Sequence, residues 1–233
     1  MEEVVRVYFR APELRQATDI KLLSMFGAEM FPGFLCLQSG ENELRLGVDG
    51  STTDPEAEAL AGERFQILLG VLRSWSALAG QRTDELNTTI GRGPITDNNG
   101  NQTVRVGSVH EYQGTEDEII SYAKCAKRAC ERSECVRNAL WLNGRRDRNA
   151  ADYYMIYEYA KQEFGKDADI ASALNVTCKD LERLRCSANN LAPREGGRHA
   201  KASRPVAWSL GNQKEFVARF IRAWVTYSGA PSI

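Results

Sequence analysis

The chain has 233 residues, of which 42% are hydrophobic and 26% are charged, and its formal net charge is −1. These values are ordinary for a globular protein, so disorder is not the expected state of the chain. The acidic start Met1-Glu2-Glu3 and the lack of an apolar run that could span a bilayer predict a cytoplasmic protein without membrane contact.

Charge is distributed unevenly along the chain. Residues 1–118 contain 10 Lys/Arg and 19 Asp/Glu, whereas residues 119–233 contain 20 and 12. Such asymmetry has two explanations: the basic part binds an anionic partner such as RNA or DNA, or the acidic and basic parts contact each other. Both explanations are open at this point.

The N-terminal part contains patterns typical of strands around one long helix. The helix begins at Asp54-Pro55-Glu56 and ends near Ala79, with a wide apolar stripe. The β-branched and alternating patterns predict strands at Val4–Phe9, Phe34–Gln38, Glu43–Val48, Leu86–Gly91 and Thr103–Val109. We therefore expect a small antiparallel sheet with a long helix.

The C-terminal part contains helical patterns. Helices are predicted at Glu116–Cys130, Ser133–Leu142, Asp152–Phe164 and Leu210–Tyr227. The whole chain is thus expected to be α+β, with an acidic sheet-plus-helix domain at residues 1–115 and a basic helical bundle at residues 116–233. Tryptophans occur within apolar patterns and are expected in the core: Trp75, Trp141, Trp208 and Trp224.

The cysteine pattern does not indicate a metal site. Cys125, Cys130 and Cys135 are spaced as CxxxxC, and the only histidines are His110 and His199. Structural zinc sites need closely paired thiolates or a histidine at set spacing. We therefore expect neither metal nor cofactor, and we expect the six cysteines to be reduced thiols.

A helix–turn–helix pattern covers residues 169–184. Asn175 suits a left-handed turn position, and Thr177 with Asp180 suits the start of a second helix. The pattern resembles the helix–turn–helix of DNA-binding regulators, which implies contact with bases from the exposed side of the second helix. That side would carry Lys179, Glu182, Arg183 and Arg185. An ordinary helical corner within a bundle is the alternative.

A polar, basic run at residues 189–204 follows, between two apolar helices. Arg194 and Arg198 supply fixed positive charge suited to phosphate, and His199 can exchange protons near neutral pH. These three residues are the candidate catalytic group. Further nucleic-acid contacts are expected from Asn189, Asn190, Lys201 and Arg204.

Arg194 and His199 form an Arg-x4-His spacing that resembles the motif of HEPN domains, helical-bundle proteins that include metal-independent ribonucleases. The resemblance implies that His199 handles the proton of the ribose 2′-hydroxyl and that Arg194 stabilises the phosphate charge. It also implies a homodimer. Residues 188–224 are additionally similar to small uncharacterised bacterial proteins, which implies no activity.

Three functional hypotheses follow. The first is a nucleic-acid-acting protein with a HEPN-like ribonuclease centre at Arg194, Arg198 and His199. The second is a helix–turn–helix regulator that binds DNA. The third is a non-catalytic interaction or structural module, in which the charged run bonds to the acidic part of the chain. Whether the protein is an enzyme is left open by the sequence.

Overall fold

A computed structural model describes residues 25–31, 35–38, 44–47, 54–76, 95–96, 102–103, 115–145, 147–190 and 208–231. The helices are α2 (Asp54–Ser76), α4 (Glu116–Arg132), α5 (Glu134–Gly144), α6 (Ala150–Phe164), α7 (Asp167–Leu174), α8 (Cys178–Asn190) and α9 (Leu210–Ser228). Residues 25–30 are also helical. Among the residues with a described structure, no helix has the length and apolar character needed to cross a membrane.

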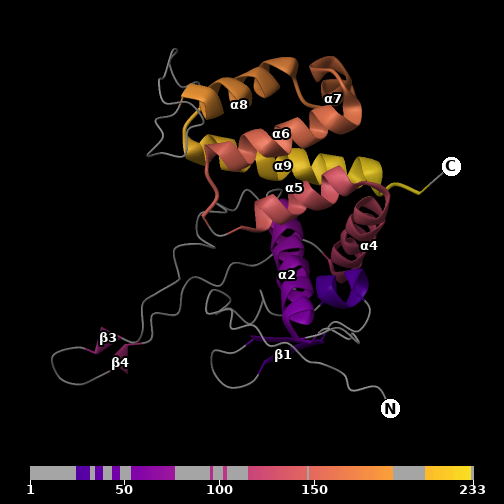
Figure 1. Cartoon of the computed structure of the whole chain (residues 1–233), viewed down its shortest axis with the longest axis vertical. Coiled ribbons are helices and arrows are strands. Elements are labelled where there is room, and N and C mark those ends of the chain that lie inside the picture. The colour runs from indigo at the N-terminus through magenta and orange to yellow at the C-terminus, as the bar shows by residue number, and fades with distance from the viewer. Residues whose placement is uncertain are drawn as a thin grey trace.

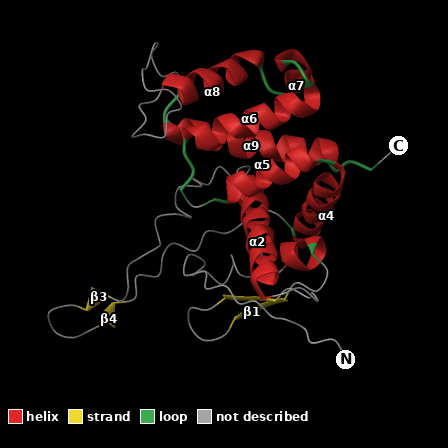
Figure 2. Ribbon diagram, viewed as in Figure 1, coloured by secondary structure: helices red, strands yellow, loops and turns green. Residues whose placement is uncertain are grey.

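The helices form a bundle with α6 near its centre (Figure 1). α6 packs against α5, α8 and α9. α4 packs against the C-terminal part of α9. α2 extends away from these helices and crosses α5, as Figures 1 and 2 show. The aromatic side chains of α9 predicted to be core are buried, and Trp224 and Phe220 are fully so.

Side-chain caps explain where several helices begin. The backbone N–H of Glu118 donates a hydrogen bond to the Thr115 hydroxyl, and the backbone N–H of Thr115 donates one to the Glu118 carboxylate. Asn149 caps α6 in the same way with Asp152. Ser133 and Ser209 cap α5 and α9. The helices predicted in the C-terminal part are confirmed to within a few residues at each end.

The prediction of an α+β fold is wrong. Every buried hydrophobic side chain that the structure describes lies on a helix. The apolar stripe of α2, which includes Leu68 and Leu72, packs against α5 and α9 and not against a sheet. An apolar stripe shows that a helix face is covered, but it does not show what covers it. The division at residues 115 and 116 stays a prediction about independent folding.

The strands form two separate antiparallel pairs. β1 (Leu35–Gln38) pairs with β2 (Leu44–Gly47), so that Leu35 lies opposite Gly47. β3 (Ile95–Thr96) pairs with β4 (Gln102–Thr103), so that Ile95 lies opposite Thr103. Two predicted strands lie outside the described residues, Val4–Phe9 and Leu86–Gly91. Residues 104–109 of the predicted strand Thr103–Val109 also lie outside them.

Two glycines set the distance between α2 and α5. A Cβ atom on Gly70 of α2 would lie 2.0 Å from the carbonyl oxygen of Leu140 on α5. A Cβ atom on Gly144 of α5 would lie 1.8 Å from the carbonyl oxygen of Gln66 on α2. The two backbones therefore touch, which no residue with a side chain would permit at either position.

Arginine side chains bind the C-terminal carbonyls of neighbouring helices. Arg73 of α2 donates to the carbonyls of Asn143 (2.7 Å) and Arg145 (2.8 Å), at the end of α5. Arg222 of α9 donates to the carbonyl of Trp75 (2.8 Å), at the end of α2. The last carbonyls of a helix have no partner within it, so these bonds satisfy groups that would otherwise need water.

The end of α9 is held in the same way by α4. Arg128 donates to the carbonyl of Gly229 (2.7 Å). Arg132 donates to the carbonyls of Ser228 (3.1 Å) and Ala230 (2.6 Å). The positive charges also lie at the negative end of the α9 dipole, which adds to the stabilisation.

We predict that Gly70→Ala lowers the free energy of unfolding by about 3 kcal/mol, because the new methyl group would overlap the α5 backbone. Gly211→Ala is the matched control, since a Cβ there lies 3.7 Å from its nearest neighbour, the Ser209 hydroxyl. This second change should leave stability unchanged or raise it by up to about 1 kcal/mol. Urea denaturation of both variants measures the difference, and equal stabilities would contradict the close crossing.

Candidate functional site

The predicted helix–turn–helix is present as α7 and α8. Asn175 follows α7 in the left-handed conformation (φ 51°, ψ 46°). The backbone N–H of Asp180 donates to the Thr177 hydroxyl (3.1 Å), and that hydroxyl donates to the Asp180 carboxylate (2.7 Å). The turn at Asn175 and the cap at Thr177 are therefore confirmed.

The inner sides of α7 and α8 are fixed to the bundle. Ile170, Leu181 and Leu184 are fully buried in the main core. The buried Tyr157 of α6 donates a hydrogen bond to the Asp167 carboxylate at the start of α7 (2.8 Å). Burial, followed by this bond, raises the pKa of Tyr157 well above its usual value. The phenol is therefore a permanent donor, and it holds α7 against α6.

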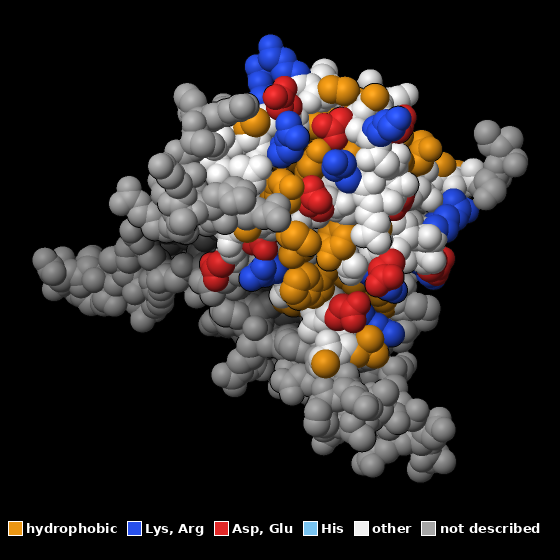
Figure 3. Space-filling view, turned by 45° about the horizontal axis from the view of Figure 1, so that its top comes forward, with side chains coloured by type: hydrophobic (Ala, Val, Ile, Leu, Met, Phe, Trp, Pro, Cys, Tyr) orange, Lys and Arg blue, Asp and Glu red, His pale blue; other side chains and the backbone are white. Residues whose placement is uncertain are grey.

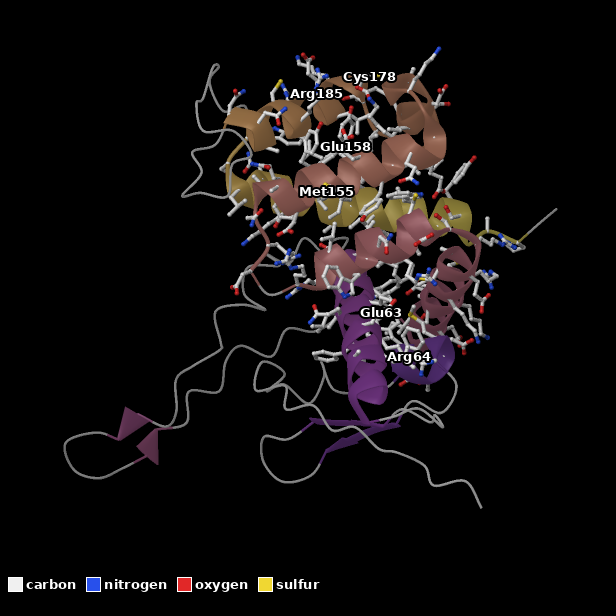
Figure 4. All side chains as sticks on the ribbon, in the orientation of Figure 1. Glu63, Arg64, Met155, Glu158, Cys178 and Arg185 are labelled. Atoms are coloured by element: carbon white, nitrogen blue, oxygen red, sulfur yellow. The ribbon has the colours of Figure 1, made fainter. Side chains whose placement is uncertain are left out.

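The outer side of α8 is exposed and carries charges of both signs. Lys179, Glu182 and Arg185 are exposed, and Asn189 is partly exposed. Arg185 and Asn189 are four residues apart and so share one face of the helix. Figure 4 shows Cys178 and Arg185 on α8, with Glu158 and Met155 on the neighbouring α6. The predicted contact Asn190, the last residue of α8, is buried.

Arg183 lies beside a tryptophan that follows it by 25 positions in the chain. Its guanidinium carbon is 6.0 Å from the centre of the Trp208 ring, and it also pairs with Asp180 at 3.4 Å. Trp208 was expected in the core, and it is only partly buried. Trp141 also departs from that prediction, since it is 37% exposed and lies against the Arg145 guanidinium.

Both ends of the segment 191–207, which contains the charged residues of the basic run, are attached to α8. The segment begins directly after Asn190, the last residue of α8. It ends at Trp208, whose backbone N–H donates to the hydroxyl of Ser187, on the last turns of α8 (2.8 Å). Ser187 is fully buried, so this attachment is part of the folded bundle. The sequence indicated the run itself but not the return of the chain to α8.

The candidate catalytic residues Arg194, Arg198 and His199 lie outside the described residues, and so do Lys201 and Arg204. Of the predicted nucleic-acid contacts, the structure places Lys179, Arg183, Arg185, Asn189 and Asn190 on α8. Lys179 and Arg183 are one turn apart, near the start of the helix. The roles expected of all these residues stay predictions.

Charge divides sharply within α7, α8 and the run that follows. Residues 166–182 contain two Lys/Arg and four Asp/Glu, a net charge of −2. Residues 183–208 contain six Lys/Arg and one acid, a net charge of +5 with His199 neutral. The positive charge is thus concentrated at the C-terminal half of α8 and beyond. The described face in Figure 3 shows positive and negative side chains interspersed, with hydrophobic groups between them.

The part of the chain with a described structure contains no group of three or more His, Cys, Asp or Glu side chains that could hold a metal ion. Five cysteines are free thiols: Cys125, Cys130, Cys135, Cys178 and Cys186. Burial raises the pKa of the Cys130 thiol to about 12, which makes it a poor nucleophile.

Comparison with known proteins identifies no relative, since no family model, curated protein or solved structure matches the chain. The functional assignment consequently depends on the arrangement of α8 and Trp208 and on the charge of the residues between them.

Proposed function

We propose that the protein binds nucleic acid through the C-terminal half of α8 and the segment 191–207. The observation that carries the proposal is the bond between Trp208 N–H and Ser187, which returns the end of the segment to α8. The chain leaves α8 after Asn190 and returns to it at Trp208. Five basic residues lie in or beside this part of the chain: Arg185, Arg194, Arg198, Lys201 and Arg204.

Phosphate is the chemical group that best suits this stretch. Arginine binds phosphate with a planar fork of donors, and several arginines in series match the repeated charge of a nucleic-acid backbone. A single acid, Glu195, occurs among the six basic residues between 183 and 208.

Binding of a duplex through the start of α8 is less favoured. A recognition helix enters the major groove by its N-terminal residues, where α8 carries Asp180 and Glu182 beside Lys179. The preceding helix would approach the phosphates with Asp167 and Asp169 in its first turn. These four carboxylates would repel the backbone, whereas the other end of α8 would attract it.

Binding of a labelled RNA oligonucleotide, followed by fluorescence anisotropy at several salt concentrations, tests the proposal. Each phosphate contact to a single strand contributes about 0.7 to the slope of log affinity against log salt. The double variant Arg198→Gln/Lys201→Gln should therefore reduce that slope by about 1.4.

The matched control is Lys124→Gln/Lys127→Gln, which removes the same charge from α4, where Lys124 is exposed and Lys127 partly buried. This control should keep the slope of the unmodified protein. Equal slopes for both double variants, or binding that does not depend on salt, would contradict the proposal and favour the interaction-module hypothesis.

We propose ribonuclease activity as a second candidate, because His199 stands between Arg198 and Lys201 in the same basic run and Arg194 precedes it in the HEPN-like spacing. In this reaction His199 accepts the proton of the ribose 2′-hydroxyl, whose oxygen attacks the adjacent phosphorus. The P–O5′ bond breaks, the 5′-oxygen takes up a proton from water, and a 2′,3′-cyclic phosphate remains. The protonated His199 then returns its proton to the solvent. Arg194 balances the negative charge on the phosphate in the transition state.

For this candidate we predict that His199→Ala abolishes cleavage of mixed RNA while the affinity for RNA changes less than about twofold. Gel analysis of RNA incubated with EDTA, alongside anisotropy binding, measures both quantities. If the unmodified protein binds RNA but leaves it intact with and without divalent metal, the ribonuclease candidate is wrong and the binding proposal stands.

A further inference from the structure

A row of three π-systems leads from the core to the surface beside α8. The rings of Phe216 and Trp208 are 5.0 Å apart between centres, and the Arg183 guanidinium carbon is 6.0 Å from the Trp208 ring. Phe216 is buried, Trp208 is partly buried, and the Arg183 side chain is 43% exposed. The row thus ends in a guanidinium that solvent can reach.

The middle member of this row is held firmly in place. The Trp208 N–H donates to Ser187 (2.8 Å), and its carbonyl accepts from the side-chain amide of Gln213 (3.3 Å). Ser187 and Gln213 are both fully buried. The backbone of Trp208 is therefore bonded on both sides by groups of the core, and the indole needs little reordering when a ligand binds.

Arg183 keeps donors for a ligand. Its bond to Asp180 is long, at 3.4 Å, and joins one nitrogen to one oxygen. A guanidinium has five N–H donors, and an ion pair this exposed is weak. The planar group can thus remain beside Trp208 while its other side meets a second flat group.

We propose that Arg183 and Trp208 form a stacking platform for an unpaired nucleobase, so that the ligand of this site is single-stranded nucleic acid. The inference rests on the proposed function, because residues 183–208 with their net charge of +5 supply the attraction for the neighbouring phosphates. Bases in a duplex already stack on their neighbours, whereas an unpaired base has a free face for an arginine plane or an aromatic ring. A platform of this kind depends on the shape of Arg183 and not only on its charge.

The test compares Arg183→Lys with Arg185→Lys in the full-length chain. Both changes keep the charge of α8 and remove a guanidinium plane, but only Arg183 lies against Trp208. The probes are oligo(dA) of about ten nucleotides, an abasic strand of the same length, and the oligo(dA)·oligo(dT) duplex. Thermal melts of both variants establish that each is folded.

We expect Arg183→Lys to weaken oligo(dA) binding about tenfold, the effect of losing one base stack, and to leave abasic-strand binding unchanged. Arg185→Lys should change the two affinities equally. Equal affinity of the unmodified protein for oligo(dA) and the abasic strand, or tighter binding of the duplex, would overturn the stacking platform but leave phosphate binding intact. Absence of salt-dependent binding to every probe would overturn the proposed function as well.

Discussion

Hydrogen bonds from arginine side chains to the C-terminal carbonyls of other helices hold this bundle together at its ends. Arg73 of α2 binds the end of α5, Arg222 of α9 binds the end of α2, and Arg128 with Arg132 of α4 binds the end of α9. Each bond satisfies a carbonyl that its own helix leaves without a partner. The positions of α2, α4, α5 and α9 are therefore linked to one another.

The close crossing of α2 and α5 is stabilised by polar groups at the end of α5, where Arg73 also binds. Gly70 and Gly144 allow the two backbones to touch, and the fully buried Asn143 donates from its side-chain amide to the Gly70 carbonyl (3.1 Å). Arg73 on α2 and Arg148, which follows α5 in the chain, both donate to the Asn143 carbonyl. A polar cluster this deeply buried is stable only when its members are hydrogen-bonded, so it fixes the position of α5 on α2.

These bonds account for part of the positive charge in the C-terminal half of the chain. Residues 119–233 have a surplus of positive charge, but Arg128, Arg132 and Arg222 bind helix ends, and Arg145 pairs with Asp152 at 2.6 Å. Part of the surplus therefore stabilises the fold. The positive charge concentrated between Arg183 and Arg204 has a different setting, since it lies at the end of α8 and in the run that follows.

Local features of the structure could be predicted from the sequence, and contacts between distant residues could not. The helix starts at Glu116 and Leu210 and the turn at Asn175 were predicted, because caps and turns act on the backbone within a few residues. The covering of α2 by α5 depends on two glycines in different helices, and neither glycine indicates the other in the sequence.

The candidate site shows the same limit. The cap at Thr177 and the basic run were visible in the sequence, whereas the contacts of Trp208 with Arg183 and Ser187 join residues on opposite sides of that run. An aromatic residue in an apolar pattern was expected in the core, and that expectation holds for Trp224 but not for Trp141. Partial exposure beside an arginine is a property of the fold, and the pattern alone does not reveal it.

The positive charge proposed to bind a ligand lies at the C-terminal half of α8 and in the residues up to Trp208, and not on α4. Amide hydrogen exchange of the full-length chain, with and without saturating single-stranded oligonucleotide, tests it most directly. We expect slower exchange in peptides covering residues 183–208 and unchanged exchange in α4. Slower exchange in α4 with residues 183–208 unaffected would contradict it.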